Sequence, residues 1–354
     1  MRKFSVLLLV FVLTATLAVF FSGCSHVDSV TVYVPDGGPA LGMAYLMKEF
    51  QEIEGVKIEY APPVKGAGDI AAAVANGDAD VAILPTNLAA KLYNEGKEIV
   101  LVGTNSHGLL YLLSTVASEE DFSLDALKGE VLHLTGESNT PEAVVRKILD
   151  SAGIEYAKSD APIEGKVALK FYADGSGIVP GLVSGSIRYA ILGEPAVSNV
   201  MQKAAAAKKA EVKIAGDLQA LWMAATNTTE SYPQTSLVVK KSLWKSDKKL
   251  VKKIAKLTID GSAALLEDAT PYLTYLIEEM GSTQVPAALK QEGVIRANID
   301  PTFGSKAKTA IEAYFNILLD FDETLIGGKL PDKDFYCGGL DDLQDYKGIV
   351  KAFA

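Results

Sequence analysis

The sequence is poor in the residues from which catalytic and metal sites are usually built. Its 354 residues include only two cysteines and three histidines, and no Cys/His spacing matches a zinc site. His107 lies in a turn and His133 in a buried strand pattern, and neither has a Ser-His-Asp context. The turn 174–177 has too few glycines for a dinucleotide fingerprint and is interpreted as a loop. We therefore expect no catalytic residues, no bound metal and no cofactor.

Clustered positive charge is also missing. The chain has 34 basic and 44 acidic residues, a formal net charge of −10. The lysines within 203–209 and 240–253 have polar neighbours in helical stretches, which is typical of solvated helix faces. Because nucleic-acid binding requires clustered Lys and Arg to neutralise phosphates, we expect no nucleic-acid partner. The hydrophobic content of 49% supports one large core or two ordinary ones.

The N-terminus carries the most specific signal. Arg2 and Lys3 precede an apolar run from Val6 to Phe21, and Ser-Gly-Cys24 follows. A basic segment, an apolar segment and small residues define a secretory signal. An uncleaved membrane span is the alternative, but the run is short of the roughly 20 residues that a span needs. Cysteine after Ser-Gly resembles a bacterial lipoprotein signal, although Phe21 stands where Leu is usual.

That resemblance implies cleavage after residue 23 and acylation of Cys24. The cleavage would remove two basic residues and change the formal net charge from −10 to −12. A lipid-blocked Cys24 leaves Cys337 as a free thiol. We expect residues 1–23 to be a signal peptide and residues 24–29 a lipid-anchored tether.

One stretch of the mature chain occurs twice. Residues 70–87 align without a gap with residues 178–195, and both copies read as an apolar helix, a glycine and a four-residue buried strand. The glycines, Gly77 and Gly185, are placed for the left-handed conformation that ends a helix. A second helix is expected after each strand, from Leu88 and from Ala196. A chance likeness of two α/β segments is the alternative explanation.

A looser repeat supports this interpretation. The strand 30–34 turns through Pro35 to Gly38 into a helix, and the strand 131–134 turns through Gly136 to Thr140 into another. Proline opens both helices, which is its favoured helical position. The chain is therefore expected to contain two similar α/β units. Because ligands of open α/β sheets bind outside the carboxyl ends of the strands, the two units would face each other across a cleft.

The remaining elements are predicted from periodicity. The run 109–116 is interpreted as the first crossing between lobes, and residues 212–215 and 235–239 as strands near the second crossing. From residue 246 onward the pattern is helical, with helices predicted over 249–267, 271–280, 285–290 and 305–321. A helical C-terminal part would complete the first lobe.

These segments together resemble the solute-binding proteins of ABC importers. The resemblance lies in Val34 to Ala40, Ala73 to Thr86 and Tyr189 to Ala196, together with the lipoprotein cysteine. The most similar branch comprises nitrate, taurine and aliphatic-sulfonate receptors and receptors for thiamine-pyrimidine precursors. The resemblance implies an α/β fold of the type II periplasmic-binding-protein architecture, with a ligand cleft between two lobes. We expect lobe 1 to comprise 30–115 and 218–354, and lobe 2 to comprise 116–217.

The expected ligand contacts lie mainly in the strand-to-helix turns. Each has a competing structural role, such as N-capping, turn formation or core packing. The candidates are Asp36, Gly37, Gly38, Thr86, Asn87, Ser138, Asn139, Thr140, Tyr172, Glu194 and Trp222. The turn 138–140 offers polar side chains and free N–H groups to an anion. Asp36 and Glu194 offer carboxylates to an amino group, and Tyr172 and Trp222 offer rings to a planar ligand.

The preferred function is a receptor that captures a small polar or heterocyclic solute by closing its lobes, and hands it to an ABC permease and ATPase. We expect a monomer, anchored by lipid to a bacterial cell membrane and facing the periplasm or the exterior. Two alternatives stay open. One is a ligand sensor for a membrane partner, and the other is an enzyme on the same fold that makes the thiamine pyrimidine. The relatives with that activity depend on a cysteine-rich motif, which this chain lacks.

Overall fold

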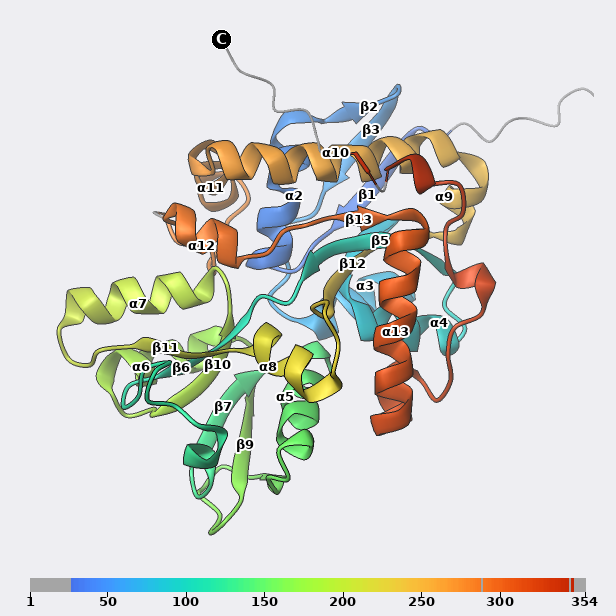
Figure 1. The fold of residues 1–354 in the computed structure, drawn as a ribbon. Coiled ribbons are helices and arrows are strands. Elements are labelled where there is room, and N and C mark those ends of the chain that lie inside the picture. The colour runs from blue at the N-terminus through green and yellow to red at the C-terminus, as the bar shows by residue number, and fades with distance from the viewer. Residues whose placement is uncertain (1–26, 288, 344, 347–354) are drawn as a thin grey trace, which may run out of the picture.

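Two β-sheets with helices on their faces build the molecule (Figure 1). The computed structural model describes residues 27–287, 289–343 and 345–346. The expected signal peptide and the acylated Cys24 lie outside the described residues. The mixed α/β architecture with two sheets confirms the fold class that the sequence predicts.

The first sheet has seven strands in the order β13-β5-β12-β4-β1-β3-β2. Its strands β1, β3 and β4 are parallel, whereas β12 runs antiparallel to both β4 and β5. The strands are β1 (Ser29–Tyr33), β2 (Glu52–Ile53), β3 (Val56–Tyr60), β4 (Val81–Pro85), β5 (Ile99–His107), β12 (Pro233–Lys240) and β13 (Thr302–Phe303). Its helices are α2 (Gly38–Glu49), α3 (Ala67–Asn76), α4 (Thr86–Asn94), α9 (Lys241–Ser246), α10 (Lys248–Glu267), α11 (Thr270–Glu278), α12 (Gln291–Arg296) and α13 (Gly304–Asp322).

The second sheet has six strands in the order β11-β6-β10-β7-β9-β8. Its strands β7, β8, β9 and β10 are parallel, and β6 runs antiparallel to β10 and β11. The strands are β6 (Leu110–Ser114), β7 (Val131–Thr135), β8 (Tyr156–Lys158), β9 (Val167–Tyr172), β10 (Tyr189–Gly193) and β11 (Lys213–Asp217). Its helices are α5 (Thr140–Ser151), α6 (Val179–Ser184), α7 (Ala196–Ala207) and α8 (Leu218–Thr226).

We call the seven-stranded sheet with its helices the first layer, and the six-stranded sheet with its helices the second layer. The repeated stretch folds alike in the two layers. The helices α3 and α6 end at Gly77 and Gly185, and both glycines have a left-handed φ of 81°. The strands β4 and β10 follow, with their first four residues buried. The helix after β10 begins at Ala196 as predicted, and the helix after β4 begins at Thr86, two residues earlier than predicted.

The chain passes between the layers at two points. The run 109–116 contains β6, which pairs with β10 and β11 rather than only crossing between lobes. Helix α8, from Leu218, packs on α5 and β6. We therefore propose that the crossings are residues 108–109 and 227–232, and that the second lobe is 110–226.

The helix predicted over 285–290 is not present among the described residues of that segment. This prediction was wrong, and α12 begins only at Gln291. Pro286 accounts for the missing start of that helix, because the residue before a proline, here Val285, is disfavoured from the helical region. The other three predicted C-terminal helices form α10, α11 and α13, within two residues of their expected ends.

Buried apolar residues form three clusters. One lies between the seven-stranded sheet and α2, α10 and α11, and a smaller one lies under α6 and α7. The third covers faces of both sheets and includes the hinge aromatics Trp222, Tyr232 and Tyr314. Cys337 is buried and free, and burial raises the pKa of its thiol to about 12.

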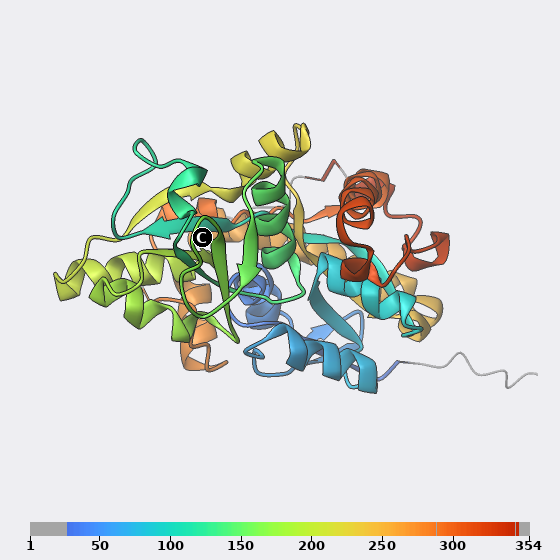
Figure 2. The same cartoon turned by 90° about the horizontal axis from the view of Figure 1, so that it is seen from below.

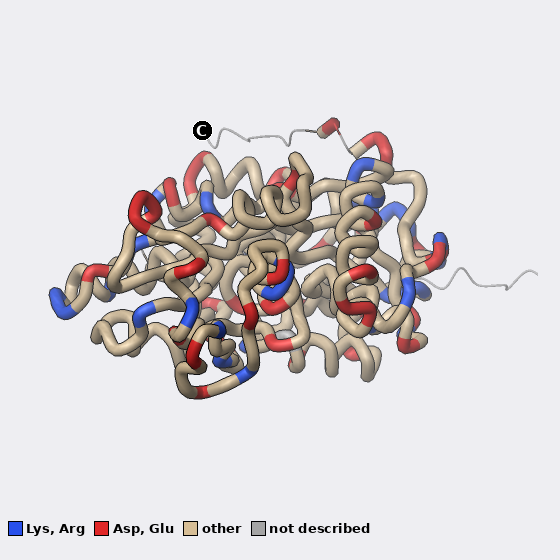
Figure 3. Tube along the Cα trace, turned by 60° about the horizontal axis from the view of Figure 1, so that its bottom comes forward, with Lys and Arg blue, Asp and Glu red and all other residues tan. Residues whose placement is uncertain are grey.

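Basic and acidic residues are interspersed along the Cα trace in Figure 3. Among the described helices, none combines the length and the apolar character needed to cross a membrane.

Candidate functional site

The parallel strands of both sheets end where the two layers meet. The turns after β1 and β4 carry Asp36 to Gly38 and Thr86 to Asn87. The turns after β7 and β10 carry Ser138 to Thr140 and Glu194. We call these four segments the facing turns. Seen from below, the helices of the second layer lie in front of this junction (Figure 2).

The facing turns approach one another closely. A Cβ built on Gly38 would lie 2.9 Å from the backbone oxygen of Glu194 and 3.1 Å from a methyl carbon of Leu109. On Gly37 it would lie 4.0 Å from Pro195. Gly37 has a φ of 94°, a conformation that other residues rarely adopt. The glycines of this turn therefore serve both the backbone conformation and the close approach of the two layers.

The carboxylate of Asp36 is hydrogen bonded to other groups of the protein. It accepts hydrogen bonds from the N–H groups of Gly37 (2.8 Å), Thr283 (2.8 Å) and Gln284 (3.2 Å), and from the hydroxyls of Ser282 and Thr283. These bonds fix the turn after β1 to the segment 282–284. The contact of Asp36 with a ligand stays a prediction, and its observed role is to position this turn.

Asn87 joins the turns of β4 and β7. Its Nδ2 donates to the backbone oxygens of Leu325 (3.0 Å) and Ser138 (3.4 Å), and its Oδ1 accepts from the Thr140 hydroxyl (3.1 Å). Asn87 and Thr140 are fully buried, as is Thr86, whose hydroxyl lies 2.9 Å from that of Ser236. Two of the predicted contacts on opposite layers are thus in direct contact with each other.

The start of α5 has no side-chain cap. Asn139 donates to the backbone oxygen of Glu137 (2.9 Å), and its own Oδ1 is buried without a partner among the described residues. Ser138 has a φ of 60° and an exposed side chain. N-capping, the competing role for this turn, therefore does not account for these two side chains.

Glu194 forms an ion pair across the two layers. Its side chain is fully buried, and Oε1 lies 2.8 Å from Nε of Arg296 in α12. Ser198 of α7 donates its N–H (3.1 Å) and its hydroxyl (3.0 Å) to the same carboxylate. Burial raises the pKa of Glu194, although the bonds from Ser198 and Arg296 act in the opposite direction. The contact of Glu194 with a ligand stays a prediction.

The two aromatic candidates lie apart. Tyr172, at the end of β9, is half-buried, and its hydroxyl lies 2.9 Å from Nδ1 of His133. Burial, assisted by Lys170, lowers the pKa of His133. Trp222 of α8 is only 2% exposed and packs among the hinge aromatics on the side of α13, away from the facing turns.

A pocket of about 330 Å³ opens between the two layers beside the facing turns. Its walls come from both layers and include two lysines without an ion-pair partner among the described residues. The lining residues are Lys65, Asp174, Gly175, Ser176, Val179, Pro180, Ala196, Asn199, Lys203, Thr283 and Gln284. The loop 174–177 therefore borders a cavity of the size that small-molecule sites occupy.

Three residues of this region were not predicted. Arg296 and Ser198 hold Glu194, and Asn105 of β5 is 1% exposed with neither amide atom hydrogen bonded in the described chain. A Cβ on Gly42 would lie 2.9 Å from Nδ2 of Asn105, one helical turn along α2 from Gly38. Arg296 could not be found from a local pattern, because its partner Glu194 lies 102 residues away in the sequence. Ser198 lies only four residues after Glu194, a helical spacing that could have pointed to this contact.

Comparison with known proteins identifies the architecture. The model of the family described as NMT1/THI5 like matches residues 46–270. A search of curated proteins gives no match.

Solved structures show the same fold. A crystal structure of an ABC transporter from Parabacteroides distasonis is 22% identical, with a TM-score of 0.70, and covers 88% of this chain and 99% of its own. The periplasmic aliphatic sulphonate binding protein SsuA from Escherichia coli is 12% identical, with a TM-score of 0.61, and covers 88% and 96%. The periplasmic nitrate-binding protein NrtA from Synechocystis PCC 6803 is 10% identical, with a TM-score of 0.55, and covers 84% and 82%.

Proposed function

Because the chain belongs to the NMT1/THI5-like family, we propose that it is the substrate-binding lipoprotein of an ABC importer. Its structural neighbours include periplasmic binding proteins for aliphatic sulphonates and nitrate. In this proposal the protein captures a small polar or heterocyclic solute between its layers and presents it to a permease. No chemical step is required.

The observation that carries the proposal is the meeting of the facing turns beside a pocket lined from both layers. A solute in that position contacts both layers at once. Binding then stabilises the closed arrangement by the difference between the affinities of the closed and open states. The contacts of Asn87 with Thr140 and of Arg296 with Glu194 already join the layers in this arrangement.

The charges in the site favour an anionic group on the solute. Asp36 and Glu194 are occupied by donors of the chain itself, which leaves them little capacity for a ligand amine. Lys65 and Lys203 line the pocket from opposite layers and lack ion-pair partners in the described chain, whereas Asp174, the carboxylate of the lining, accepts the Ser176 N–H (2.7 Å). The start of α5 is less suited to an anion than the sequence suggests, because Glu142 accepts the Ser138 N–H (2.6 Å) and Pro141 has no N–H. We therefore propose a solute with a carboxylate, sulfonate or phosphate group, and a heterocyclic body is compatible with the half-buried ring of Tyr172.

Native mass spectrometry of the protein expressed without residues 1–24 tests this function. We expect a small molecule to be released on denaturation, and to raise the melting temperature when it is added back. Lys203→Gln should weaken its binding several-fold, whereas Lys209→Gln, beyond the end of α7 and outside the pocket, should not. If sulfonates, carboxylates, phosphates, amino acids and pyrimidines all fail to shift the melting temperature, the receptor function is wrong.

The anchor and the partners need a separate experiment. We propose that Cys24 is acylated and tethers the protein to the membrane beside the permease and ATPase. Cys24→Ser should move the protein from the membrane fraction to the soluble fraction without changing its ligand affinity. Co-purification of the full-length protein with a permease supports an importer, whereas co-purification with a membrane kinase supports the sensor alternative.

The enzyme alternative receives no support from the remaining cysteine. Cys337 is buried beside β5, where its backbone N–H donates to the backbone oxygen of Leu101. Burial raises the pKa of its thiol, which is therefore protonated at neutral pH. A buried neutral thiol is a poor nucleophile. In the part of the chain that the structure describes, no group of three His, Cys, Asp or Glu side chains is placed to hold a metal.

A further inference from the structure

A basic surface formed by α9 and the first half of α10 stands out from the acidic chain. Residues 240–256 contain eight lysines and one acidic residue, although the formal net charge of the whole chain is −10. Acidic residues elsewhere conceal this local excess in the overall composition. We call the group of Trp244, Lys245, Lys248, Lys249, Lys252 and Lys253 the basic face.

The lysines of the basic face lie on the side of α10 that is turned away from the core. Leu250, Val251 and Ile254 are buried in the apolar cluster of the first layer, whereas Lys248 and Lys249 are exposed. Because residues three and four apart share a helix face, the lysines of α10 occupy the face opposite to these apolar residues. This exposure agrees with the solvated helix face that the sequence predicts.

The protein itself neutralises only part of this charge. Lys249 pairs with Glu54 (2.5 Å) and Lys252 pairs with Asp342 (2.8 Å). Both pairs are largely exposed, so they are weak and can exchange with other anions. Three lysines of the basic face have no ion-pair partner in the described part of the chain, namely Lys245, Lys248 and Lys253. The basic face is therefore available to an anionic partner.

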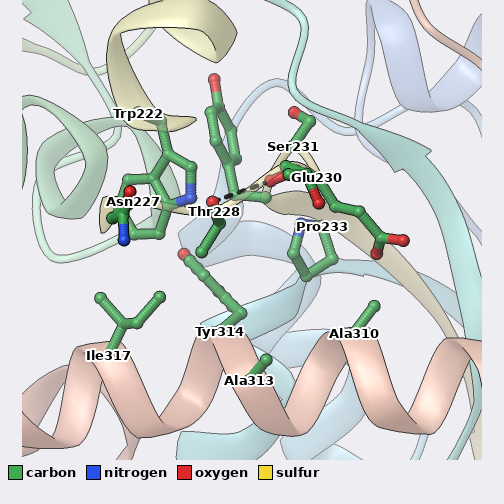
Figure 4. Close-up of a pocket in the computed structure, with 12 residues that line it drawn as sticks. Trp222, Asn227, Thr228, Glu230, Ser231, Pro233, Ala310, Ala313, Tyr314 and Ile317 are labelled. Atoms are coloured by element: carbon green, nitrogen blue, oxygen red, sulfur yellow. Dashed lines mark hydrogen bonds between the residues drawn. The ribbon is translucent and has the colours of Figure 1, made fainter. Parts of the chain in front are cut away.

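An aromatic ring lies among these lysines. Trp244 is partly exposed and packs against the apolar cluster of the first layer, and Nζ of Lys248 lies 5.1 Å from its ring centroid. A tryptophan flanked by lysines is typical of surfaces that meet lipid headgroups, because the ring is apolar and its N–H is polar. The other tryptophan, Trp222, is 2% exposed and packs beside Tyr314 in the hinge (Figure 4).

The strand β1 begins beside the basic face. Its first residue, Ser29, pairs with Lys57 of β3, and the turn before β3 carries Glu54, the partner of Lys249. Figures 1 and 2 show α9 on the same side of the molecule as the start of β1. Cys24 precedes Ser29 by five residues, which span at most about 18 Å when fully extended. A lipid on Cys24 would therefore hold the basic face near the membrane.

We propose that the basic face docks on the anionic headgroups of a phospholipid bilayer, with the ring of Trp244 at the level of the headgroups. An anionic leaflet attracts lysines that lie within a Debye length of it, about 8 Å at physiological ionic strength. The facing turns follow the carboxyl ends of the strands, whereas the basic face lies where β1 begins, so docking keeps the facing turns away from the bilayer. The docking goes beyond solute capture, and it depends neither on that function nor on the acylation of Cys24.

Vesicle binding by the protein expressed without residues 1–24 tests this docking. That protein keeps both sheets, lacks the acyl chain and is acidic as a whole, so an anionic surface repels it except at the basic face. We expect it to sediment with vesicles that contain phosphatidylglycerol, but not with vesicles of phosphatidylcholine alone, and added salt should release it. Brominated phosphatidylglycerol should quench the tryptophan emission, and Trp244→Phe should abolish this quenching because Trp222 is buried.

A triple variant removes charge from the basic face without breaking an ion pair of the described chain. Lys245→Gln, Lys248→Gln and Lys253→Gln together should weaken binding to the phosphatidylglycerol vesicles about tenfold or more. The melting temperature should change little, because these side chains lie outside the core. Its response to an added solute should not change, which separates a failure of docking from a failure of the receptor function.

A matched triple variant removes the same charge from the second layer. Lys166→Gln, Lys209→Gln and Lys213→Gln lie outside the basic face and should leave vesicle binding nearly unchanged. Equal sedimentation with both kinds of vesicle, or no sedimentation with either, overturns the proposal. Equal weakening by the two triple variants also overturns it, because the net charge of the protein and not the basic face would then control binding.

Discussion

At the scale of single residues, the charged groups of the site act first on the protein itself. Asp36 and Glu194 were singled out in the sequence as carboxylates for a ligand, and the structure surrounds each with donors from distant segments. Carboxylates that accept several hydrogen bonds are strongly oriented. Their substitution is therefore expected to change the stability of the closed arrangement, whatever the ligand is.

Arg296→Ala tests the ion pair between the layers. Among the described residues, the change leaves the fully buried carboxylate of Glu194 with the two donors of Ser198. Breaking a buried pair by removing one partner is costly, and we expect the free energy of unfolding in urea to fall by about 3 kcal/mol. Arg188→Ala is the control, because the pair of Arg188 with Glu130 is exposed, and it should cost about 0–1 kcal/mol. The double variant Glu194→Gln with Arg296→Ala should recover much of the loss, and a simple sum of the two single losses would contradict the pairing.

The raised pKa of Glu194 predicts a pH dependence. In the folded protein burial holds this pKa above its ordinary value of 4.5, so the unfolded chain releases the proton first as the pH rises. The unfolded chain then binds fewer protons than the folded one, and the contribution of Glu194 to the free energy of unfolding falls through that window and levels off above it. Urea unfolding across pH 4–8 should show that the wild type loses stability relative to Glu194→Gln as the pH rises. A gain instead would mean that Arg296 lowers the pKa below its ordinary value.

At the scale of elements, the repeat was predicted because its signals are local. Each copy contains the signals for a helix, a glycine with a positive φ and a buried strand within about 15 residues. Both copies fold as expected. The two-residue strand β13 was missed, because its only partner is β5, which lies far away in the sequence. The same reason hid Arg296, whose partner Glu194 is 102 residues away, whereas Asn87 and Thr140 were found because each lies at the start of a helix that follows a strand.

Gly38→Ala tests the close approach of the facing turns. The new methyl group would lie 2.9 Å from the backbone oxygen of Glu194, and a backbone atom cannot move aside as a flexible side chain can. We expect the two layers to separate, so that small-angle scattering reports a larger radius of gyration. Gly68→Ala is the matched control, because a Cβ there meets nothing within 4 Å in α3 and alanine favours the helix. An unchanged radius of gyration for Gly38→Ala would show that the distance between the two layers does not depend on this contact.

At the scale of the whole molecule, the two layers meet through polar contacts at the turns and aromatic contacts at the hinge. The polar set includes the pair of Arg146 in α5 with Asp322 in α13, which are 2.9 Å apart. The aromatic set joins Trp222 to Tyr314. Polar contacts exchange readily with water, whereas buried rings do not, so the turns are expected to part while the hinge stays packed.

Asn298 ties the hinge together and provides a test of this view. It has a φ of 44°, and its Nδ2 donates to the backbone oxygen of Gly108 in the first crossing (3.1 Å) and to Oε1 of Gln219 in α8 (2.9 Å). Asn298→Gly keeps the positive φ and removes both bonds, which should lower the free energy of unfolding by about 1–2 kcal/mol. Hydrogen exchange should then accelerate at Gly108, whose N–H bonds the Ser231 hydroxyl of the second crossing.

Asn227→Gly is the matched control for that experiment. Asn227 has a φ of 52° at the end of α8 and an exposed side chain, so glycine should relieve strain there at little cost. If both variants accelerate exchange at Gly108 equally, the effect comes from backbone freedom in the hinge and not from the clamp of Asn298. If only Asn298→Gly accelerates exchange at Gly108, the hydrogen bonds of Asn298 hold the two crossings together as one unit. A solute that closes the turns must then bend the chain on either side of these crossings.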